Sequence, residues 1–250
     1  MVFYDTAYGK IAFNLDYSNL LVRLSGGFDS AVMLYALATA LKEHNVSATI
    51  YPITVRKVGN PTKDAGNDKA NPYPVVDIIL NYVRKDFSNL NIENPQRLDI
   101  NKWWKGNPGK KYSGAQDELI LKVINDFNLG KDFAIYNGVT MNPNITIGEE
   151  KVNPEVHRQV IDAAGKIEGT LSVQLLSQKF NCEMEPFRNF DKRAVFSLAD
   201  RLGILEDMLS ITRSCEGFRR ATDNFTTTCK TKPICWWCYE REWANENYER

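Results

Sequence analysis

A glycine-rich turn between two apolar segments constrains the fold of this chain more than any other feature. The turn reads SGGFDS at residues 25–30; it follows a short buried strand predicted over 20–24 and precedes a helix predicted over 31–42. Adjacent glycines let the backbone adopt positive φ and approach a ligand closely. A strand that runs through such a turn into a helix is typical of an open α/β sheet, in which ligands bind at the carboxyl ends of the strands.

Further strand and helix patterns alternate along the chain. This alternation predicts an α/β fold with a doubly wound, mainly parallel five-stranded sheet. Proline at 74 suits the first turn of a helix, Ser113 with Gln116 forms a capping-box pattern, and Asp191 suits an N-cap. The other predicted strands cover 48–55, 97–100, 133–136 and 183–187, and the other predicted helices cover 76–87, 120–127, 170–180 and 195–202.

Length, charge and hydropathy exclude several classes of protein. The 250 residues are enough for one sizeable core, or for a core with a small appendage. The 31 basic and 31 acidic residues balance, so no global field attracts the chain to nucleic acid or to a membrane. The longest apolar run, 31–41, is shorter than the roughly 20 residues of a spanning helix, and the N-terminus lacks a signal-peptide pattern. We therefore expect a cytoplasmic protein with no membrane partner.

The glycine turn has the groups that an anion requires. Successive N–H groups of Gly26 and Gly27 at the positive end of a helix form an anion-binding nest, and the hydroxyls of Ser25 and Ser30 add donors. Asp29 would repel bare phosphate, so it fits such a site only if Mg²⁺ or water lies between them. The structural alternative is a tight turn in which Asp29 caps the helix. Neither G-x-x-x-x-G-K-[ST] nor G-x-G-x-x-G occurs in the chain.

Four cysteines gather near the C-terminus, and a fifth, Cys182, lies apart. Four thiolates in a reducing compartment suit a closed, structural Zn²⁺ site, and two of them form a C-x₂-C pair. The alternatives are buried or reactive cysteines and a redox pair. We predict a small C-terminal zinc-binding region over 206–250, after a nucleotide-binding domain over 1–205. The predicted zinc ligands are Cys215, Cys229, Cys235 and Cys238.

Other polar residues occupy positions where chemistry can occur. Lys192 opens the last predicted helix directly after a strand, from where its ammonium could reach a phosphate; the alternative is a solvated surface lysine. Turn-forming residues at 137–142 follow the fourth predicted strand, on the same sheet edge as the glycine turn. A local basic patch surrounds the cysteines, and could bind a carboxylate, bind nucleic acid or keep the tail soluble. It consists of Arg213, Arg219, Arg220, Lys230 and Lys232.

The segment LVRLSGGFDSAVMLYAL at 21–37 resembles the S-G-G-x-D-S pyrophosphate-binding loop of the ATP pyrophosphatase (PP-loop) superfamily. The resemblance implies an adenine nucleotide alpha-hydrolase-like fold that binds ATP and Mg²⁺. It also implies that a substrate carboxylate or carbonyl attacks the α-phosphate and releases pyrophosphate. The nucleotide-binding residues that it implies are Ser25, Gly26, Gly27, Asp29 and Ser30.

The tail, with FDKRAVFSLADRLGIL at 190–205 and the cysteines, resembles the 7-cyano-7-deazaguanine synthase family of queuosine biosynthesis. This implies a carbon–nitrogen ligase that joins ammonia to a 7-carboxy-7-deazaguanine-like carboxylate, giving an amide or nitrile. It further implies Lys192 and Asp29 as catalytic residues, bound zinc and a homodimer. The chain departs from the family in the Cys229–Cys235 spacing and after the second and fourth strands, so ATP chemistry is implied more directly than the substrate.

Two other hypotheses fit the same residues. One is a tRNA-modifying thiolase of the same superfamily. In it Cys182 would be the catalytic cysteine, because the other four cysteines are assigned to zinc. The other is a nucleic-acid-binding zinc module on a degenerate nucleotide fold, which would use the basic patch and release no pyrophosphate. The intact SGGFDS turn and the zero net charge favour the enzyme over the binding module.

Overall fold

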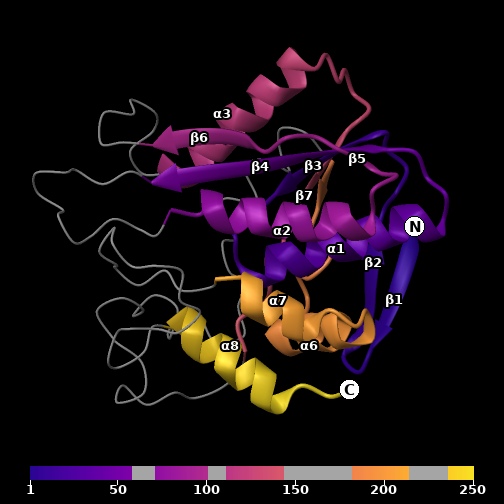
Figure 1. The fold of residues 1–250 in the computed structure, drawn as a ribbon, viewed down its shortest axis with the longest axis vertical. Coiled ribbons are helices and arrows are strands. Elements are labelled where there is room, and N and C mark those ends of the chain that lie inside the picture. Colours follow the sequence, from indigo (N-terminus) through magenta and orange to yellow (C-terminus); the bar gives the residue numbers. More distant parts are fainter. Residues whose placement is uncertain (58–70, 101–110, 144–181, 214–235) are drawn as a thin grey trace, which may run out of the picture.

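The computed structural model describes residues 1–57, 71–100, 111–143, 182–213 and 236–250 (Figure 1). Several predictions fall outside these described residues. The sequence also predicts a long loop over 57–74 and a polar insertion over 143–166, and most of each lies outside the described residues. The helix predicted over 170–180 and the predicted zinc ligands Cys215, Cys229 and Cys235 lie outside them as well.

A parallel sheet with the order β5-β4-β3-β7-β8 forms the centre of the protein, and β6 also pairs with β4. Every strand pair in this sheet is parallel, which confirms the α/β fold and the mainly parallel sheet. The strands are β3 (Asn19–Arg23), β4 (Thr49–Lys57), β5 (Asn91–Ile92), β6 (Gln96–Ile100), β7 (Ala134–Tyr136) and β8 (Glu183–Met184).

The number of strands differs from the predicted five, because the strand beside β4 is divided. β5 pairs with the start of β4 and β6 with its end, so the described residues contribute six strands to the sheet. Pro95 lies between the two and has no N–H to donate to β4, which accounts for the interruption. Pro186 similarly follows β8, which is shorter than the 183–187 strand predicted.

Helices cover both faces of the sheet, so the fold is doubly wound. In β3, Leu20 and Val22 pack with α1 and α2, while Leu21 between them packs with α3 on the opposite face. Figure 1 shows α3 on one side of the sheet and the other helices on the other side. The helices are α1 (Phe28–Glu43), α2 (Tyr73–Asp86), α3 (Lys111–Asp126), α6 (Lys192–Arg201), α7 (Leu205–Ile211) and α8 (Trp236–Asn247).

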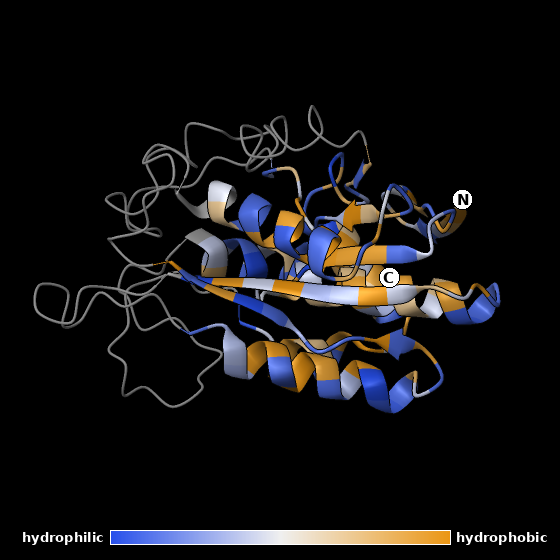
Figure 2. Cartoon of the chain, turned by 90° about the horizontal axis from the view of Figure 1, so that it is seen from above, coloured by the Kyte–Doolittle hydropathy of each residue, from blue (hydrophilic) through white to orange (hydrophobic). Residues whose placement is uncertain are grey.

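The hydropathy of the elements matches these layers. In Figure 2 the long strand across the middle of the view is mainly apolar or intermediate in hydropathy, whereas the helices combine apolar and strongly hydrophilic residues. Strands buried on both faces and helices buried on one side have this distribution. Within the described residues, no helix is both long and apolar enough to cross a membrane.

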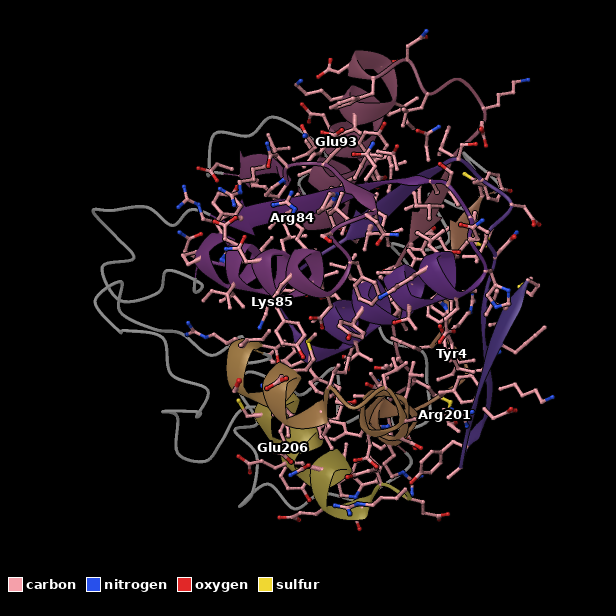
Figure 3. The ribbon with its side chains drawn as sticks, turned by 45° about the vertical axis from the view of Figure 1, so that its right-hand side comes forward. Tyr4, Arg84, Lys85, Glu93, Arg201 and Glu206 are labelled. Carbon is pink, nitrogen blue, oxygen red and sulfur yellow. The ribbon has the colours of Figure 1, made fainter. Side chains whose placement is uncertain are left out.

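An N-terminal hairpin, which the sequence patterns did not predict, covers one end of the core. β1 (Val2–Thr6) pairs antiparallel with β2 (Gly9–Phe13), and the turn ends at Gly9, whose φ of +126° is open only to glycine. Tyr4 donates its hydroxyl hydrogen to the Ala36 carbonyl of α1 at 3.2 Å, and Arg201 of α6 donates to the Asp5 carbonyl at 3.0 Å (Figure 3). The hairpin is thereby tied to both helices.

The predicted helix starts are correct in two cases and wrong in one. Pro74 lies in the first turn of α2, and the Asp191 carboxylate caps α6 by accepting from the N–H of Arg193 at 3.0 Å. The predicted capping box at Ser113 is wrong, because α3 already begins at Lys111 and Ser113 lies inside it. Gln116 instead accepts a hydrogen bond from Arg23 of the central strand at 3.4 Å.

The predicted boundary between residues 205 and 206 falls within α7, and the division of the chain into two regions there stays a prediction.

Candidate functional site

The glycine turn lies where the strand order of the sheet reverses. From β3 the chain passes through α1 to β4 on one side, and it later reaches β7, on the other side of β3, through α3. In open α/β sheets, ligands bind outside the carboxyl ends of the strands at such a switch point. The turns that follow β3 and β7 therefore border the ligand position that this topology defines.

The backbone of the turn requires glycine at residue 26. Gly26 has φ of +81°, and a Cβ built there would lie 3.3 Å from two side-chain carbons of Val75. Gly27, not Asp29, is the N-cap residue of α1, and no side-chain capping hydrogen bond is present at this helix start. The alternative in which Asp29 caps this helix is therefore wrong. The first N–H groups of any α-helix lack partners within the helix and remain available to an anion.

The two serines close a ring of hydrogen bonds that holds the turn. The N–H of Gly27 donates to Ser25 Oγ at 3.3 Å, the Ser25 and Ser30 hydroxyls lie 3.2 Å apart, and Ser30 Oγ donates to the Gly27 carbonyl at 3.1 Å. The N–H of Ser25 also donates to Ser30 Oγ at 3.3 Å. Both hydroxyls thus fix the conformation of the turn, and their predicted contacts with phosphate stay predictions.

A buried lysine connects the glycine turn to the C-terminal helix. Lys192 is only 2% exposed, and its Nζ lies 3.2 Å from Asp29 Oδ2 and 2.7 Å from Glu240 Oε2. The interpretation of Lys192 as a solvated surface residue is therefore wrong. The other carboxylate oxygen of Asp29, Oδ1, is buried and receives no hydrogen bond from the described residues. An acceptor in that state fits a site that holds a cation or a donating ligand.

Arg193, the second cation of the DKR sequence, does not join this group. Its guanidinium bonds the Asp191 carboxylate at 2.8 Å and lies over the rings of Tyr8 and Trp243, 5.1 and 4.9 Å from their centroids. The hydrogen bond with Asp191 raises the pKa of Arg193. Arg193 therefore attaches α6 to the hairpin and to α8, and Lys192 is the cation at the glycine turn.

The turn after β7 meets the start of α1, as the shared sheet edge predicts. A Cβ built on Gly138 would lie 3.2 Å from both the nitrogen and the Cα of Ser30, and 3.3 Å from the carbonyl carbon of Asp29. Thr140 and Asn142, which follow Gly138 in the same turn region, are buried, with exposed fractions of 1% and 2%. Gly138 thus permits close contact between the two turns.

We expect the substitution Gly138→Val to lower the free energy of unfolding by about 1–3 kcal/mol, because the added carbons meet backbone atoms of α1. Urea unfolding measures this loss, with Gly138→Ala as the graded control. Alanine places a single carbon at a distance that a small shift of the neighbouring turn can relieve, so its cost should be smaller. Equal stability of the valine variant and the wild type would contradict the close contact.

A second polar group, which the sequence patterns did not reveal, lies under α3. Arg23, at the end of the central strand and 5% exposed, lies 3.7 Å from carboxylate oxygens of both Asp117 and Glu183. Burial raises the pKa of Glu183 to about 7, while the charge of Arg23 acts in the opposite direction. Burial also raises the pKa of Glu185, which accepts from Arg188 at 3.0 Å.

The raised pKa of Glu183 predicts how stability depends on pH. Between its ordinary value of 4.5 and about 7 the folded protein binds a proton that the unfolded chain has released, so stability falls as pH rises through this window. We expect Glu183→Gln to remove this loss, which is on the order of 3 kcal/mol. Asp117 still faces Arg23 in the variant. Urea unfolding at pH 5 and pH 8 measures the difference, and the same pH dependence in wild type and variant would contradict it.

Cys182 is a buried thiol at the amino end of β8. It is 6% exposed, and its pKa is raised to about 11, mainly by burial and further by the charge of Glu183. Its thiol is therefore protonated at neutral pH and a poor nucleophile.

Of the predicted zinc ligands, the structure places Cys238. It is 5% exposed and lies in the first turn of α8. At that position the helix dipole favours a thiolate. Burial lowers the pKa of Arg241, and the charges of nearby Cys238 and Asp29 oppose that shift. Cys215, Cys229 and Cys235 lie outside the described residues; among those described, no three His, Cys, Asp or Glu side chains gather as metal ligands.

The basic patch predicted around the cysteines is placed only in part. The N–H of Arg213 donates to the Gly26 carbonyl at 2.8 Å, so the segment after α7 contacts the glycine turn directly. The other four residues of the patch, Arg219, Arg220, Lys230 and Lys232, lie outside the described part of the chain.

Comparison with known proteins leaves the family open. No family model and no curated protein matches the chain. Among solved structures, it is similar to the U34-tRNA thiolase NcsA from Methanococcus maripaludis with its [4Fe-4S] cluster, at 13% identity and a TM-score of 0.43. That match covers 92% of this chain, which spans 65% of the NcsA chain.

A second similar structure is a protein from the universal stress protein family from Burkholderia pseudomallei. It is 13% identical, with a TM-score of 0.25, over 50% of this chain and 83% of that one. At these TM-scores neither likeness defines an activity for this chain. The fold and the site define an α/β protein with a glycine turn at its switch point and a buried lysine beside it.

Proposed function

We propose that this protein is an ATP-dependent, adenylate-forming enzyme that binds ATP at the SGGFDS turn and releases AMP and pyrophosphate. One observation carries the proposal: the ammonium of Lys192 lies buried 3.2 Å from the Asp29 carboxylate. A buried lysine at a glycine turn on the switch-point edge is suited to a ligand with concentrated negative charge. The resemblance of residues 21–37 to the PP-loop superfamily supports ATP as that ligand.

The residues of the site divide the work of phosphate binding. The N–H groups at the start of α1 would donate hydrogen bonds to the phosphate oxygens, and the Lys192 ammonium would stabilise the negative charge that develops at phosphorus. Asp29, with its buried Oδ1, would hold Mg²⁺, which when bound neutralises phosphate charge. This chemistry relies on positioning and charge neutralisation, so it needs no nucleophilic side chain.

The reaction consists of two displacements. A carboxylate oxygen of the substrate attacks the α-phosphorus, the bond from that phosphorus to the bridging oxygen breaks, and pyrophosphate leaves. A nitrogen nucleophile then attacks the acyl carbon of the adenylate, AMP leaves, and the nitrogen loses a proton to solvent. The product is an amide. In a second round the amide oxygen attacks the α-phosphorus of another ATP and pyrophosphate leaves; AMP then departs with that oxygen, the nitrogen loses two protons to solvent in all, and a nitrile results.

We propose a 7-carboxy-7-deazaguanine-like carboxylate as substrate and ammonia as nitrogen donor. The basis is the resemblance of residues 190–205 and the cysteines to the 7-cyano-7-deazaguanine synthase family. In the structure, Lys192 of that segment reaches the glycine turn, so the two resembling segments meet at one place. A homodimer and cytoplasmic location belong to the same proposal.

Thiolation of tRNA is the competing use of the same adenylation. As formulated from the sequence, that hypothesis assigns the sulfur chemistry to Cys182. Its burial and its pKa of about 11 make Cys182 unsuited to act as a thiolate nucleophile. The carboxylate and ammonia pair is therefore the acceptor chemistry that we favour.

Zinc is proposed as a structural ion held by Cys215, Cys229, Cys235 and Cys238. The buried position of Cys238 at a helix start suits a thiolate ligand. Four protein ligands would fill a tetrahedral site, which leaves no open position for catalysis.

The test of the proposed function is pyrophosphate release from ATP and Mg²⁺ with a panel of acceptors. The panel contains 7-carboxy-7-deazaguanine with ammonia, other carboxylates with ammonia, and tRNA. We expect release that depends on the 7-deazaguanine carboxylate and on ammonia. Release triggered only by tRNA would establish thiolation-type chemistry instead. No release with any acceptor, from protein shown to be folded, would contradict the enzyme and favour the nucleic-acid-binding module.

A further inference from the structure

The beginnings of three helices converge at the glycine turn. Asp29 is the second residue of α1, Lys192 is the first residue of α6, and Glu240 lies in the second turn of α8. The rings of Phe28 and Phe196, from α1 and α6, lie 4.4 Å apart and pack the first two helices together. The side chain of Glu240 is fully buried where α8 joins them.

Of the carboxylates that the described residues bring to Lys192, Glu240 lies closer than Asp29. The Nζ–Oε2 distance is 2.7 Å, whereas the distance from Nζ to Asp29 Oδ2 is 3.2 Å. The side chain of Asp29 is 20% exposed, so water also solvates it, while Glu240 has no exposure. A charge-assisted hydrogen bond strengthens when both partners are removed from water. Glu240 therefore contributes more than Asp29 to holding the ammonium in one place.

Packing of α8 fixes the position of Glu240 in turn. The neighbouring Arg241 donates to the Thr212 carbonyl at 3.1 Å and to the Leu209 carbonyl, both at the end of α7. Its guanidinium also lies over the ring of Phe28, 5.8 Å from the centroid. The same turn of α8 thus contacts the end of α7 and the residue that precedes Asp29.

We propose that Glu240 is a positioning residue of the nucleotide site. Its carboxylate holds the Lys192 ammonium beside Asp29, facing the position of the phosphates, without itself touching the nucleotide. Helix α8 is thereby part of the ATP site, although it lies far along the chain from the glycine turn. This inference rests on the proposed binding of ATP at that turn.

A purely structural ion pair would have the same geometry, and a double-mutant cycle on ATP affinity separates the two roles. If Glu240 acts through Lys192, its substitution matters only while the lysine is present. If the pair only stabilises the fold, the two substitutions affect ATP binding independently or not at all. Thermal unfolding of each variant records the structural contribution separately.

The experiment is calorimetric titration of the full chain with ATP and Mg²⁺. The variants are Glu240→Gln, Lys192→Met and the double variant, with Glu246→Gln, an exposed glutamate of the same helix, as the matched control. We expect about 10- to 100-fold weaker binding for Glu240→Gln, from loss of a charged hydrogen bond. The double variant should bind no more weakly than Lys192→Met, and Glu246→Gln should match the wild type.

A further variant keeps the test valid if single changes destabilise the fold. Removing one partner of a buried ion pair leaves the other charge uncompensated, whereas an apolar pair of similar size can be as stable as the ion pair. Lys192→Met with Glu240→Leu should therefore unfold near the wild-type temperature and still bind ATP as weakly as Lys192→Met. Glu240→Asp, which keeps the charge, should recover part of the affinity.

The outcomes distinguish this inference from the proposed function. Wild-type protein that binds no ATP overturns the proposed function, and this inference with it. Wild-type protein that binds ATP, with unchanged affinity in Glu240→Gln, overturns only the positioning role. Independent effects of the two substitutions, which multiply in the double variant, also overturn it.

Discussion

Replacing Asp29 with alanine is expected to abolish acceptor-dependent pyrophosphate release while leaving the fold intact. The carboxylate has one oxygen 3.2 Å from Lys192 and one that is buried and receives no hydrogen bond from the part of the chain that the structure describes, so it has capacity for a bound cation. Loss of one preorganised charge in such a site lowers turnover on the order of 100- to 1000-fold. Lys192 keeps Glu240 as its partner at 2.7 Å, which protects the fold.

The assay for this variant compares the turnover rate with thermal unfolding. Asp29→Asn keeps the shape of the side chain and removes its charge, so it should lose turnover as the alanine variant does. Asp16→Ala, at an exposed position, is the control and should match the wild type in both measurements. Turnover at the wild-type rate in Asp29→Ala would refute the role assigned to the glycine turn.

Replacing Cys238 with serine is expected to release most of the bound zinc and to destabilise the protein. A structural zinc site contributes its binding free energy to folding, so loss of one of four ligands weakens both together. We expect a loss of about 3 kcal/mol, which lowers Tm by about 10 °C for a chain of this size. Cys235→Ser should behave in the same way, because both are members of the C-x₂-C pair.

Metal analysis and thermal unfolding of the purified protein check this result. Cys182→Ser is the matched control, since Cys182 is also buried but lies beside β8, apart from the other cysteines in the sequence. It should retain the zinc of the wild type. A zinc-free wild-type protein, or a Cys238→Ser variant with unchanged zinc and Tm, would refute the structural zinc site.

Apolar periodicity predicted the layers of the fold because the parallel strands are buried on both faces. Segment 133–136 is a continuous apolar run and segment 20–24 is apolar except at Arg23, and their boundaries agree with β7 and β3 within a residue or two. The glycine turn between β3 and α1 was predictable for a related reason. Only glycine adopts the φ of +81° found at residue 26 without strain, so the sequence carries a direct sign of that conformation.

The missed features depend on contacts between residues far apart in the chain. The strands β1 and β2 have five residues each, too few for the alternation of apolar and polar residues to stand out in the sequence. Their apolar side chains, Tyr4 and Phe13 among them, are recognisable as core residues only from their packing in the folded protein. Glu240 is one of several acidic residues in a polar tail, and nothing local marks it as buried. Its position becomes informative only when folding brings α8 beside Lys192.

The group under α3 was missed for a different reason. Arg23 interrupts the apolar run of the central strand, and the pattern alone does not reveal which partners compensate a charge at that position. The compensating carboxylates, Asp117 and Glu183, come from α3 and β8, whose placement requires the complete sheet. Buried charges of this kind are therefore found from structure rather than from sequence.

The measurement that tests the central claim most directly is the identity of the products formed from ATP. Protein incubated with Mg²⁺, ammonia and 7-carboxy-7-deazaguanine is analysed by phosphorus NMR or by separation of ATP labelled at the α- and γ-phosphates. Attack at the α-phosphorus predicts AMP and pyrophosphate in equal amounts, dependent on the acceptor and absent with Asp29→Ala. Formation of ADP and inorganic phosphate, or no cleavage by folded protein that binds ATP, would contradict adenylate formation at the glycine turn.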